Sequence, residues 1–216
     1  MLNTENKLAI NCNKKMFIKY LGKLFLSFLF LICIIPLSIA DEKSIIRSIE
    51  DYLNNFQTIT AKFKQITIED NKVKTGMLYV SKPGKLRFEY LTPQKITIVL
   101  NNNQIMYHEH ELDETSYTKE NNYFFKLLAN KKINLQNDIS RVISDKNNIS
   151  LHITKRVDNV NAIIIFATNP ITLREVIFEN EGQETYHLSF YDIQYNKNLN
   201  SRLFSVQNPK FYSAPY

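Results

Sequence analysis

The spacing of apolar residues changes twice along the chain. Over residues 41–56 they recur every three or four positions, the period of an amphipathic helix. Over residues 59–68 β-branched residues alternate imperfectly with polar ones, which is typical of a strand. A second helical pattern covers residues 122–129, and a further short helix is expected over residues 131–137. The predicted order is therefore helix, strands, short helices, strands.

Turn residues separate most of the expected strands. These strands cover residues 59–68, 76–80, 86–90, 96–100, 104–108, 149–154, 162–167, 173–178 and 186–193. Pro83-Gly84 and Asn101-Asn102-Asn103 are too short for the crossovers that parallel strands need, so we expect an antiparallel meander. A closed or half-closed barrel with a cavity and a sandwich both fit. The helical insertion favours a barrel plugged or lidded by helices.

The first forty residues predict an export signal. Lysines precede the predominantly apolar run from Leu24 to Ile35, which is shorter than the roughly 20 residues of a membrane-spanning helix. Pro36 ends the run, and we expect cleavage between Ala40 and Asp41. Residues 1–40 would then be removed and residues 41–216 would form a single domain. A retained N-terminal anchor is the alternative, and the start can be Met1 or Met16.

Cysteine and charge usage narrow the function of the mature chain. Cys12 and Cys33 both lie in the expected signal, which excludes disulfides, thiol catalysis and thiolate metal sites from the rest. Cys33 lies inside the apolar run, so we expect no lipid attachment. Five of the 27 basic residues and one of the 21 acidic residues also lie in the signal. The remainder is nearly neutral, which argues against nucleic acid as a partner.

Catalytic motifs are missing from the expected mature chain. Its three glycines (Gly76, Gly84 and Gly182) form neither a phosphate-binding loop nor a Gly-x-Ser-x-Gly elbow. His108-Glu109-His110-Glu111 can place two imidazoles on one strand face, as a metal site does, but a solvated polar strand end is the commoner explanation. We therefore expect no catalytic residue, no metal and no cofactor, and a protein that acts by binding.

The aromatic residues point to an apolar pocket. They are spread over the expected helix, strands and insertion, and core packing explains many of them. Residues 123–128 are harder to explain as core, because this short helical segment is apolar on most sides and is flanked by polar loops. A lid over an apolar pocket fits this pattern.

Five segments occur in an order that a known family shares. Phe63-Lys64-Gln65 is similar to a Phe-x-Gln motif in a first strand, and residues 76–93 are similar to the signature G-x-L-x-x-x-[RK]-P-x-x-L/F-R/N-W-x-x-x-x-P. Residues 105–107, 125–129 and 203–204 match later segments. Together they resemble LolA, the family of periplasmic outer-membrane lipoprotein carriers, over residues 45–209.

The resemblance implies a fold and a site. The fold is mainly β with helices (α+β), an open half-barrel antiparallel sheet with an apolar cavity lidded by short helices. The implied cavity residues are Leu53, Phe56, Phe63, Met77, Tyr79, Leu86, Phe88, Tyr90, Ile96, Ile98 and Met106. The implied lid consists of Tyr123, Phe124, Phe125, Leu127, Leu128 and Ala129. Phe88 stands where the family usually has tryptophan.

The resemblance also implies a latch that holds the empty carrier closed. Lys82 stands where the family commonly has arginine, and Arg87 is grouped with it. The implied acceptors are backbone carbonyls of the lid near Leu128 and Ala129. Lysine lacks the rigid guanidinium fork, so this latch is expected to be looser.

The implied function is transport of lipoproteins through the periplasm. The expected partners are acylated lipoproteins, an inner-membrane lipoprotein-releasing ABC transporter and an outer-membrane receptor, with the protein itself a monomer. A periplasmic sensor or adaptor of the same fold, which binds lipoproteins or lipids, is the alternative. A lipid-processing hydrolase is a further alternative, against which the missing serine elbow and cysteine argue.

Overall fold

The computed structural model describes residues 37–119, 123–155, 160–178 and 184–207. The chain divides into residues 1–45 and residues 46–216. Of the first unit, residues 37–45 are described, and they form the beginning of helix α2 (Leu37–Asn55). The expected export signal thus falls largely outside the described residues. Its expected cleavage point after Ala40 lies within α2 and stays a prediction.

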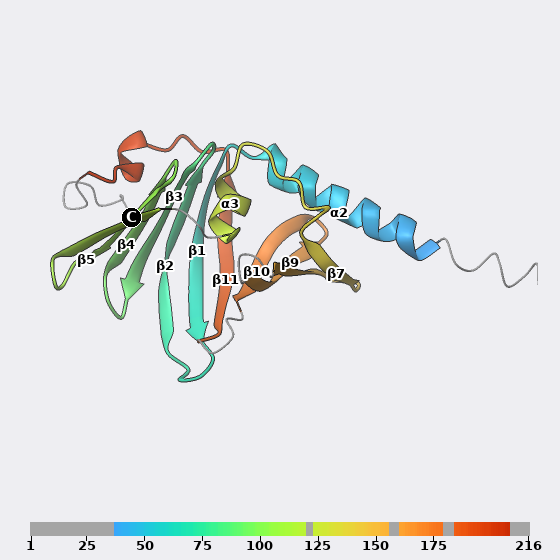
Figure 1. Cartoon of the computed structure of the whole chain (residues 1–216), viewed down its shortest axis with the longest axis horizontal. Helices are drawn as coiled ribbons and strands as arrows, with labels where there is room; N and C mark the ends of the chain where they lie inside the picture. Colours follow the sequence, from blue (N-terminus) through green and yellow to red (C-terminus); the bar gives the residue numbers. More distant parts are fainter. Residues whose placement is uncertain (1–36, 120–122, 156–159, 179–183, 208–216) are drawn as a thin grey trace, which may run out of the picture. The chain divides into compact units, whose positions relative to one another are not determined.

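The second unit is built on one antiparallel sheet of eleven strands. The strands are β1 (Thr58–Thr67), β2 (Val73–Ser81), β3 (Lys85–Thr92), β4 (Ile96–Asn101), β5 (Gln104–Glu109), β6 (Glu114–Lys119), β7 (Ile139–Ser144), β8 (Asn148–Lys155), β9 (Val160–Thr168), β10 (Ile171–Phe178) and β11 (Tyr186–Tyr195). Their order is β6-β5-β4-β3-β2-β1-β11-β10-β9-β8-β7 (Figure 1). Strands β6 and β7 are the two edges, so the sheet is open.

Alternate residues of each strand point to opposite faces of the sheet. We call the face that carries Phe63, Leu78 and Phe88 the helix face, because helix α3 (Tyr123–Ala129) packs on it. The opposite face over β2–β5 carries Tyr79, Val99 and Met106, which pack against the short 3-10 helix η1 (Ser201–Phe204). We call residues 199–206 the strap and this face the strap face.

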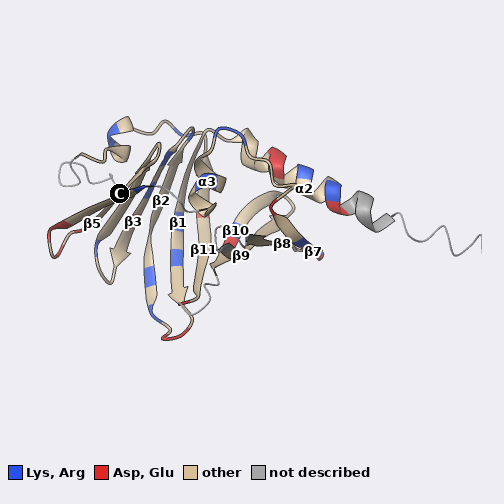
Figure 2. Cartoon of the chain, viewed as in Figure 1, with Lys and Arg blue, Asp and Glu red and all other residues tan. Residues whose placement is uncertain are grey.

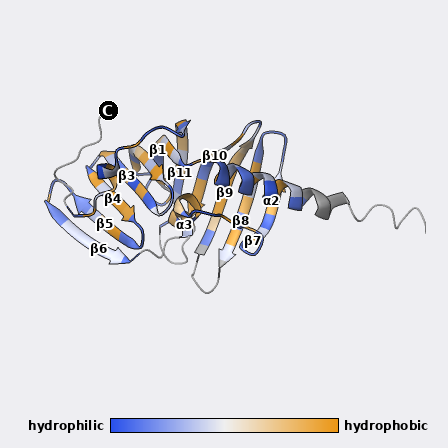
Figure 3. Ribbon diagram, turned by 90° about the horizontal axis from the view of Figure 1, so that it is seen from above, coloured by the Kyte–Doolittle hydropathy of each residue, from blue (hydrophilic) through white to orange (hydrophobic). Residues whose placement is uncertain are grey.

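Both faces are buried in the middle of the sheet. In β3, residues 86–89 are all buried, although successive side chains point in opposite directions. In β6, by contrast, every residue is exposed. Figure 3 shows the strands banded in hydrophobic and hydrophilic colours, and Figure 2 shows charged residues on α2, along β1 and β2 and at several turns.

The structure confirms the expected open antiparallel sheet with helices and differs from the expectation in four elements. Strands β6 and β7 were not anticipated, and neither was η1. The helix expected over residues 131–137 is not formed. Its backbone groups bond to α2 instead, because Asn54 exchanges two hydrogen bonds with Ile133 (3.0 and 2.8 Å) and Glu50 accepts one from the Leu135 amide (2.7 Å).

Within the described residues, no helix combines the length and the apolar composition that crossing a membrane requires.

Candidate functional site

The floor of the helix face is an aromatic cluster formed by residues of β1 and β3, the two strands that flank β2. The ring of Phe63 meets Phe88 and Tyr90 edge to face, with centroids 5.2 and 4.9 Å apart. Gly76 lies opposite Phe63 in the register, and a Cβ there would come within 2.7 Å of the Phe63 ring and 2.1 Å of the Glu89 carbonyl oxygen. The missing side chain at Gly76 therefore makes room for the floor.

Helix α3 covers this floor with two phenylalanines. Phe125 stacks on Phe88 with ring centroids 5.9 Å apart. Phe124 stacks on Phe190 at 5.9 Å and meets Phe178 edge to face at 5.6 Å. The short helix thus joins β3 on one side to β10 and β11 on the other, with aromatic rings between helix and sheet.

The last turns of α2 add a second cover. Leu53 is fully buried and Phe56, directly after the helix, is 2% exposed. The Tyr52 hydroxyl lies 3.0 Å from that of Tyr195 and accepts a hydrogen bond from the Leu173 amide at 3.1 Å. Burial raises the pKa of Tyr52 well above its usual range, so the hydroxyl stays protonated. These bonds hold residues 46–55 to the neighbouring strands β10 and β11.

The turn between β2 and β3 touches both covering helices. The Lys82 ammonium donates to the Leu53 carbonyl in the last turn of α2 and lies 4.0 Å from the centroid of the Phe56 ring. Burial lowers the pKa of Lys82 to about 8. Two residues later, the Gly84 amide donates to the carbonyl of Ala129, the last residue of α3, at 2.7 Å. Both bonds satisfy helix C-terminal carbonyls, which have no partner inside a helix.

This arrangement corrects the expected latch. Lys82 was expected to bind carbonyls near Leu128 and Ala129, whereas its acceptor is Leu53. The Lys82 amide donates to the Gln57 carbonyl at 2.9 Å, which places the side chain beside α2. The lid is held instead by the Gly84 amide, which sequence reasoning did not consider.

Arg87 does not belong to the latch. It is 2% exposed and lies on the strap face, because it points away from its neighbour Phe88. Its Nε lies 3.3 Å from the Glu89 carboxylate, and its Nη1 donates to the Leu203 carbonyl of the strap at 3.3 Å. The strap, and not the lid, is its partner.

The expected cavity residues divide between the two faces. Six strand residues lie on the helix face, and Leu53 and Phe56 cover that face from α2. The six are Phe63, Leu86, Phe88, Tyr90, Ile96 and Ile98. Met77, Tyr79 and Met106 lie on the strap face, where they pack with η1. The structure therefore does not bring these last three residues to the covered helix face.

The expected lid residues do form one helix. Phe124, Leu127, Leu128 and Ala129 are buried, and Phe125 contacts the floor. The Tyr123 hydroxyl donates to the Asp138 carboxylate at 3.0 Å, which fixes the beginning of the helix.

The histidine pair belongs to a polar network on the strap face. His108 is 1% exposed and its Nδ1 lies 2.9 Å from the Thr115 hydroxyl, so it is not the solvated strand end that we expected. The His110 ring is exposed and bonds the Thr97 hydroxyl at 2.9 Å. Within the described part of the chain, no group of three or more His, Cys, Asp and Glu side chains is placed to hold a metal ion.

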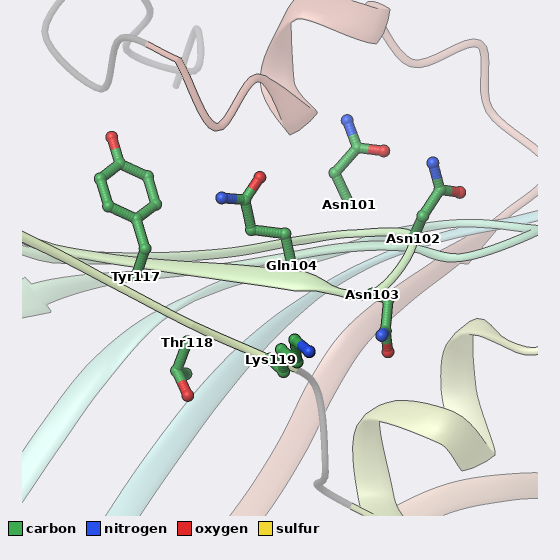
Figure 4. Close-up of a pocket in the computed structure, with 7 residues that line it drawn as sticks. All are labelled: Asn101, Asn102, Asn103, Gln104, Tyr117, Thr118 and Lys119. Carbon is green, nitrogen blue, oxygen red and sulfur yellow. The ribbon is translucent and has the colours of Figure 1, made fainter.

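An open surface depression of about 640 Å³ lies beside the edge strand β6. It is lined by residues 101–104 and 117–119. Figure 4 shows the side chains of Asn101, Gln104 and Tyr117 on one side of strands β4–β6 and those of Asn103 and Thr118 on the other side. The sequence indicated only a turn at this position.

Comparisons with known proteins agree with this geometry. The family model described as outer membrane lipoprotein carrier protein LolA matches residues 54–207. The outer-membrane lipoprotein carrier protein of Pseudomonas paraeruginosa is 22% identical over 189 residues, which cover 79% of this chain and 86% of that protein. The protein of the same name from Dechloromonas aromatica is 30% identical over 91 residues, covering 40% of this chain and 44% of that protein.

A solved structure shares the fold. The crystal structure of an uncharacterized conserved protein from Thermus thermophilus superposes with a TM-score of 0.53 at 10% identity, and the match covers 79% of this chain and 96% of that chain. Because the family model spans well over half of the sequence, the chain belongs to the outer-membrane lipoprotein carrier family LolA.

Proposed function

We propose that this protein is a carrier that binds the acyl chains of lipoproteins on its helix face. The observation that carries the proposal is the aromatic floor covered by α3, whose contacts with the sheet are made by Phe124 and Phe125. Such a cover is separable from the sheet, because α3 is only seven residues long. An acyl chain that displaced it would exchange one apolar surface for another.

The energetics of acyl chains favour a covered face. Each methylene removed from water contributes about 0.8 kcal/mol. A carrier must therefore shelter the chains and still release them, which requires that closure of the empty protein offsets part of the binding energy. The two helix-end bonds made by Lys82 and Gly84 supply such closure, since both are lost when the helices move away from the turn.

The family and the export signal expected over residues 1–40 favour a place of action in the periplasm. In this proposal the protein accepts lipoproteins from an inner-membrane ABC exporter and passes them to the outer membrane, where a receptor can take over the cargo. The proposal needs no cofactor and no second copy of the chain.

A competition experiment tests the binding step. An apolar fluorophore that brightens on the purified protein should be displaced by a triacylated lipoprotein and not by the same lipoprotein without its acyl chains. Phe125→Ala should raise the affinity for the fluorophore, because the lid that the fluorophore displaces is then held less firmly, whereas Tyr117→Ala, at the exposed edge strand, should leave it unchanged. Equal displacement by the acylated and non-acylated cargo would contradict the proposal.

A transfer experiment tests the latch. Lys82→Leu should accept lipoprotein from inner membranes and pass it poorly to acceptor membranes, because closure no longer favours the empty state. Lys82→Arg, which keeps the cation, should transfer at least as well as the wild type. Transfer by Lys82→Leu at the wild-type rate would rule out a role for Lys82 in release.

A further inference from the structure

Gln65 places a polar side chain in the apolar floor of the helix face. Gln65 is 8% exposed, and it lies on the same face of β1 as the fully buried Phe63. Its Oε1 accepts a hydrogen bond from the Tyr90 hydroxyl at 2.8 Å. Its Nε2 donates to no described residue. A buried carboxamide with unused N–H groups is unfavourable unless another acceptor reaches it.

Gln65 lies beneath the lid helix α3. In the register, Phe63 lies opposite Phe190 and Gln65 lies opposite Leu188, and the next pair on this face joins Thr67 and Tyr186. Phe124 of α3 contacts Phe190 on one side of the Gln65 row, and it contacts Phe178, the partner of Tyr186, on the other side. A ligand that displaced Phe124 would therefore meet the Gln65 carboxamide.

Two further groups make this end of the floor polar. Lys74 lies opposite Gln65 on β2, and its ammonium is 5.9 Å from the centroid of the Tyr90 ring. Tyr90 packs edge to face on Phe63, so its ring belongs to the floor while its hydroxyl positions Gln65. Amide and ammonium donors at the end of an apolar surface match a ligand that has a hydrocarbon body and a carbonyl at one end.

The other end of the floor is closed by the latch, where the Lys82 ammonium and the Gly84 amide already donate to the Leu53 and Ala129 carbonyls. Ile59 and Gln65 are six residues apart on β1, which corresponds to about 20 Å of strand. Ile59 is paired with Val80, just before the turn in which Lys82 holds α2. The helix face therefore has a direction, from the Gln65 end to the Lys82 end.

We propose that Gln65, positioned by Tyr90 and assisted by Lys74, forms a subsite for the ester or amide carbonyl that links an acyl chain to its head group. This inference rests on the proposed carrier function and adds the orientation of the cargo. The carbonyl lies at Gln65, the head group leaves the protein beyond Lys74, and the hydrocarbon runs toward Lys82. A hydrocarbon without a carbonyl would fill the same surface and leave the Gln65 amide unpaired.

The test uses two probes that differ only in a carbonyl. Monopalmitoyl glycerol carries an ester and hexadecyl glycerol carries an ether, and each is titrated below its micellar concentration against the bound apolar fluorophore. The wild type should bind the ester roughly three- to tenfold more tightly, the fold-change that one neutral hydrogen bond supplies. Gln65→Leu should abolish this preference while it keeps the affinity for the ether.

Control variants separate the subsite from a structural role. Thr67→Val changes a buried polar residue on the same face of β1, and the ester preference should survive in it. Tyr90→Phe should reduce the preference, because Gln65 loses its fixed orientation. If Gln65→Leu lost affinity for both probes equally, Gln65 would have a structural role, and the proposed subsite would be overturned.

Two further outcomes would distinguish failure of the subsite from failure of the carrier proposal. Equal binding of ester and ether by the wild type would overturn the carbonyl subsite and leave the carrier proposal intact. Failure of the wild type to bind either probe would overturn both proposals.

Discussion

The two faces of the central strands are both buried, but by different kinds of contact. On the helix face, Phe63 and Phe88 meet other aromatic rings, and the cover is attached through a few helix-end bonds. On the strap face, Tyr79 and Met106 are mixed with charged and polar groups, among them the 3.3 Å contact between Arg87 and Glu89. An apolar surface with a weakly attached cover can exchange that cover for a ligand. A buried ion pair cannot lose its partners cheaply, because breaking it leaves an uncompensated charge.

This difference assigns separate roles to the two covers. The strap adds backbone acceptors to the polar network, since Arg87 bonds the Leu203 carbonyl and the Asn101 side chain bonds the Phe204 carbonyl at 3.0 Å. Lid helix α3 is attached to the turn by the Gly84 amide. We expect the strap face to contribute mainly stability and the helix face to contribute mainly binding.

The largest expected effect comes from filling the space at Gly76. In Gly76→Ala the new methyl would lie 2.1 Å from the Glu89 carbonyl oxygen, and relieving that clash requires β2 and β3 to move apart. We expect a loss of about 3 kcal/mol in the free energy of unfolding, measured by urea denaturation. Gly84→Ala is the control, because its Cβ meets only Asn102 at 3.1 Å and its φ of 74° costs about 1–2 kcal/mol. A smaller loss at Gly76 than at Gly84 would contradict the packing of the floor.

Replacing one phenylalanine on each face by alanine tests directly whether one face contributes stability and the other binding. Phe204→Ala on the strap should cost about 3 kcal/mol of unfolding free energy, because the ring is 1% exposed, and should leave binding of the apolar fluorophore unchanged. Phe125→Ala on the lid should cost less than about 1 kcal/mol, because the ring is only partly buried, and should alter binding. Urea denaturation and fluorophore titration of both variants give the comparison. The reverse pattern would remove the distinction between the faces.

The order of elements could be predicted from the sequence because most strands carry a clear apolar pattern. The two strands that were missed are the two edges, β6 and β7. All of β6 is exposed, so Glu114–Lys119 shows no apolar alternation, and the solvated residues give no signal of pairing. The helix expected over residues 131–137 failed because side chains of α2, far away in sequence, take its backbone bonds.

The site could be predicted only in part, for a related reason. Alternation predicts that Tyr79 and Val80 point to opposite faces, but it does not say which face the helices cover when both are buried. Tyr79 and Met106 were therefore grouped with Phe63 and Phe88, although they lie on the other face. The acceptor of Lys82 depends on where α2 ends in space, and a local motif carries no information on that.

Removing the Lys82 cation should loosen α2 more than α3. In Lys82→Leu the Leu53 carbonyl loses its donor, while the Gly84 amide still holds Ala129. We expect the last turn of α2 to lose about 1 kcal/mol of local stability. This loss should appear as roughly fivefold faster hydrogen exchange in that turn, with little change in residues 123–129. Lys85→Leu, at the first residue of β3, is the matched control. Faster exchange confined to α3 would restore the latch that the sequence implied.

The smallest expected effect is a dependence of stability on pH. Burial lowers the pKa of Lys82 to about 8 from its ordinary 10.5, so the folded protein gives up this proton more readily than the unfolded chain. The unfolded state therefore binds more protons between these values, and stability should rise as the pH increases from about 8 to 10.5. The gain should stay below about 1 kcal/mol, because the side chain is only half-buried and solvent screens its charge. Urea denaturation across this range should show the rise in the wild type and not in Lys82→Leu or in Lys82→Arg, whose guanidinium remains charged. An identical pH profile in all three proteins would mean that Lys82 is solvated, and that the attachment of α2 to the turn rests on the Lys82 amide and its Gln57 acceptor alone.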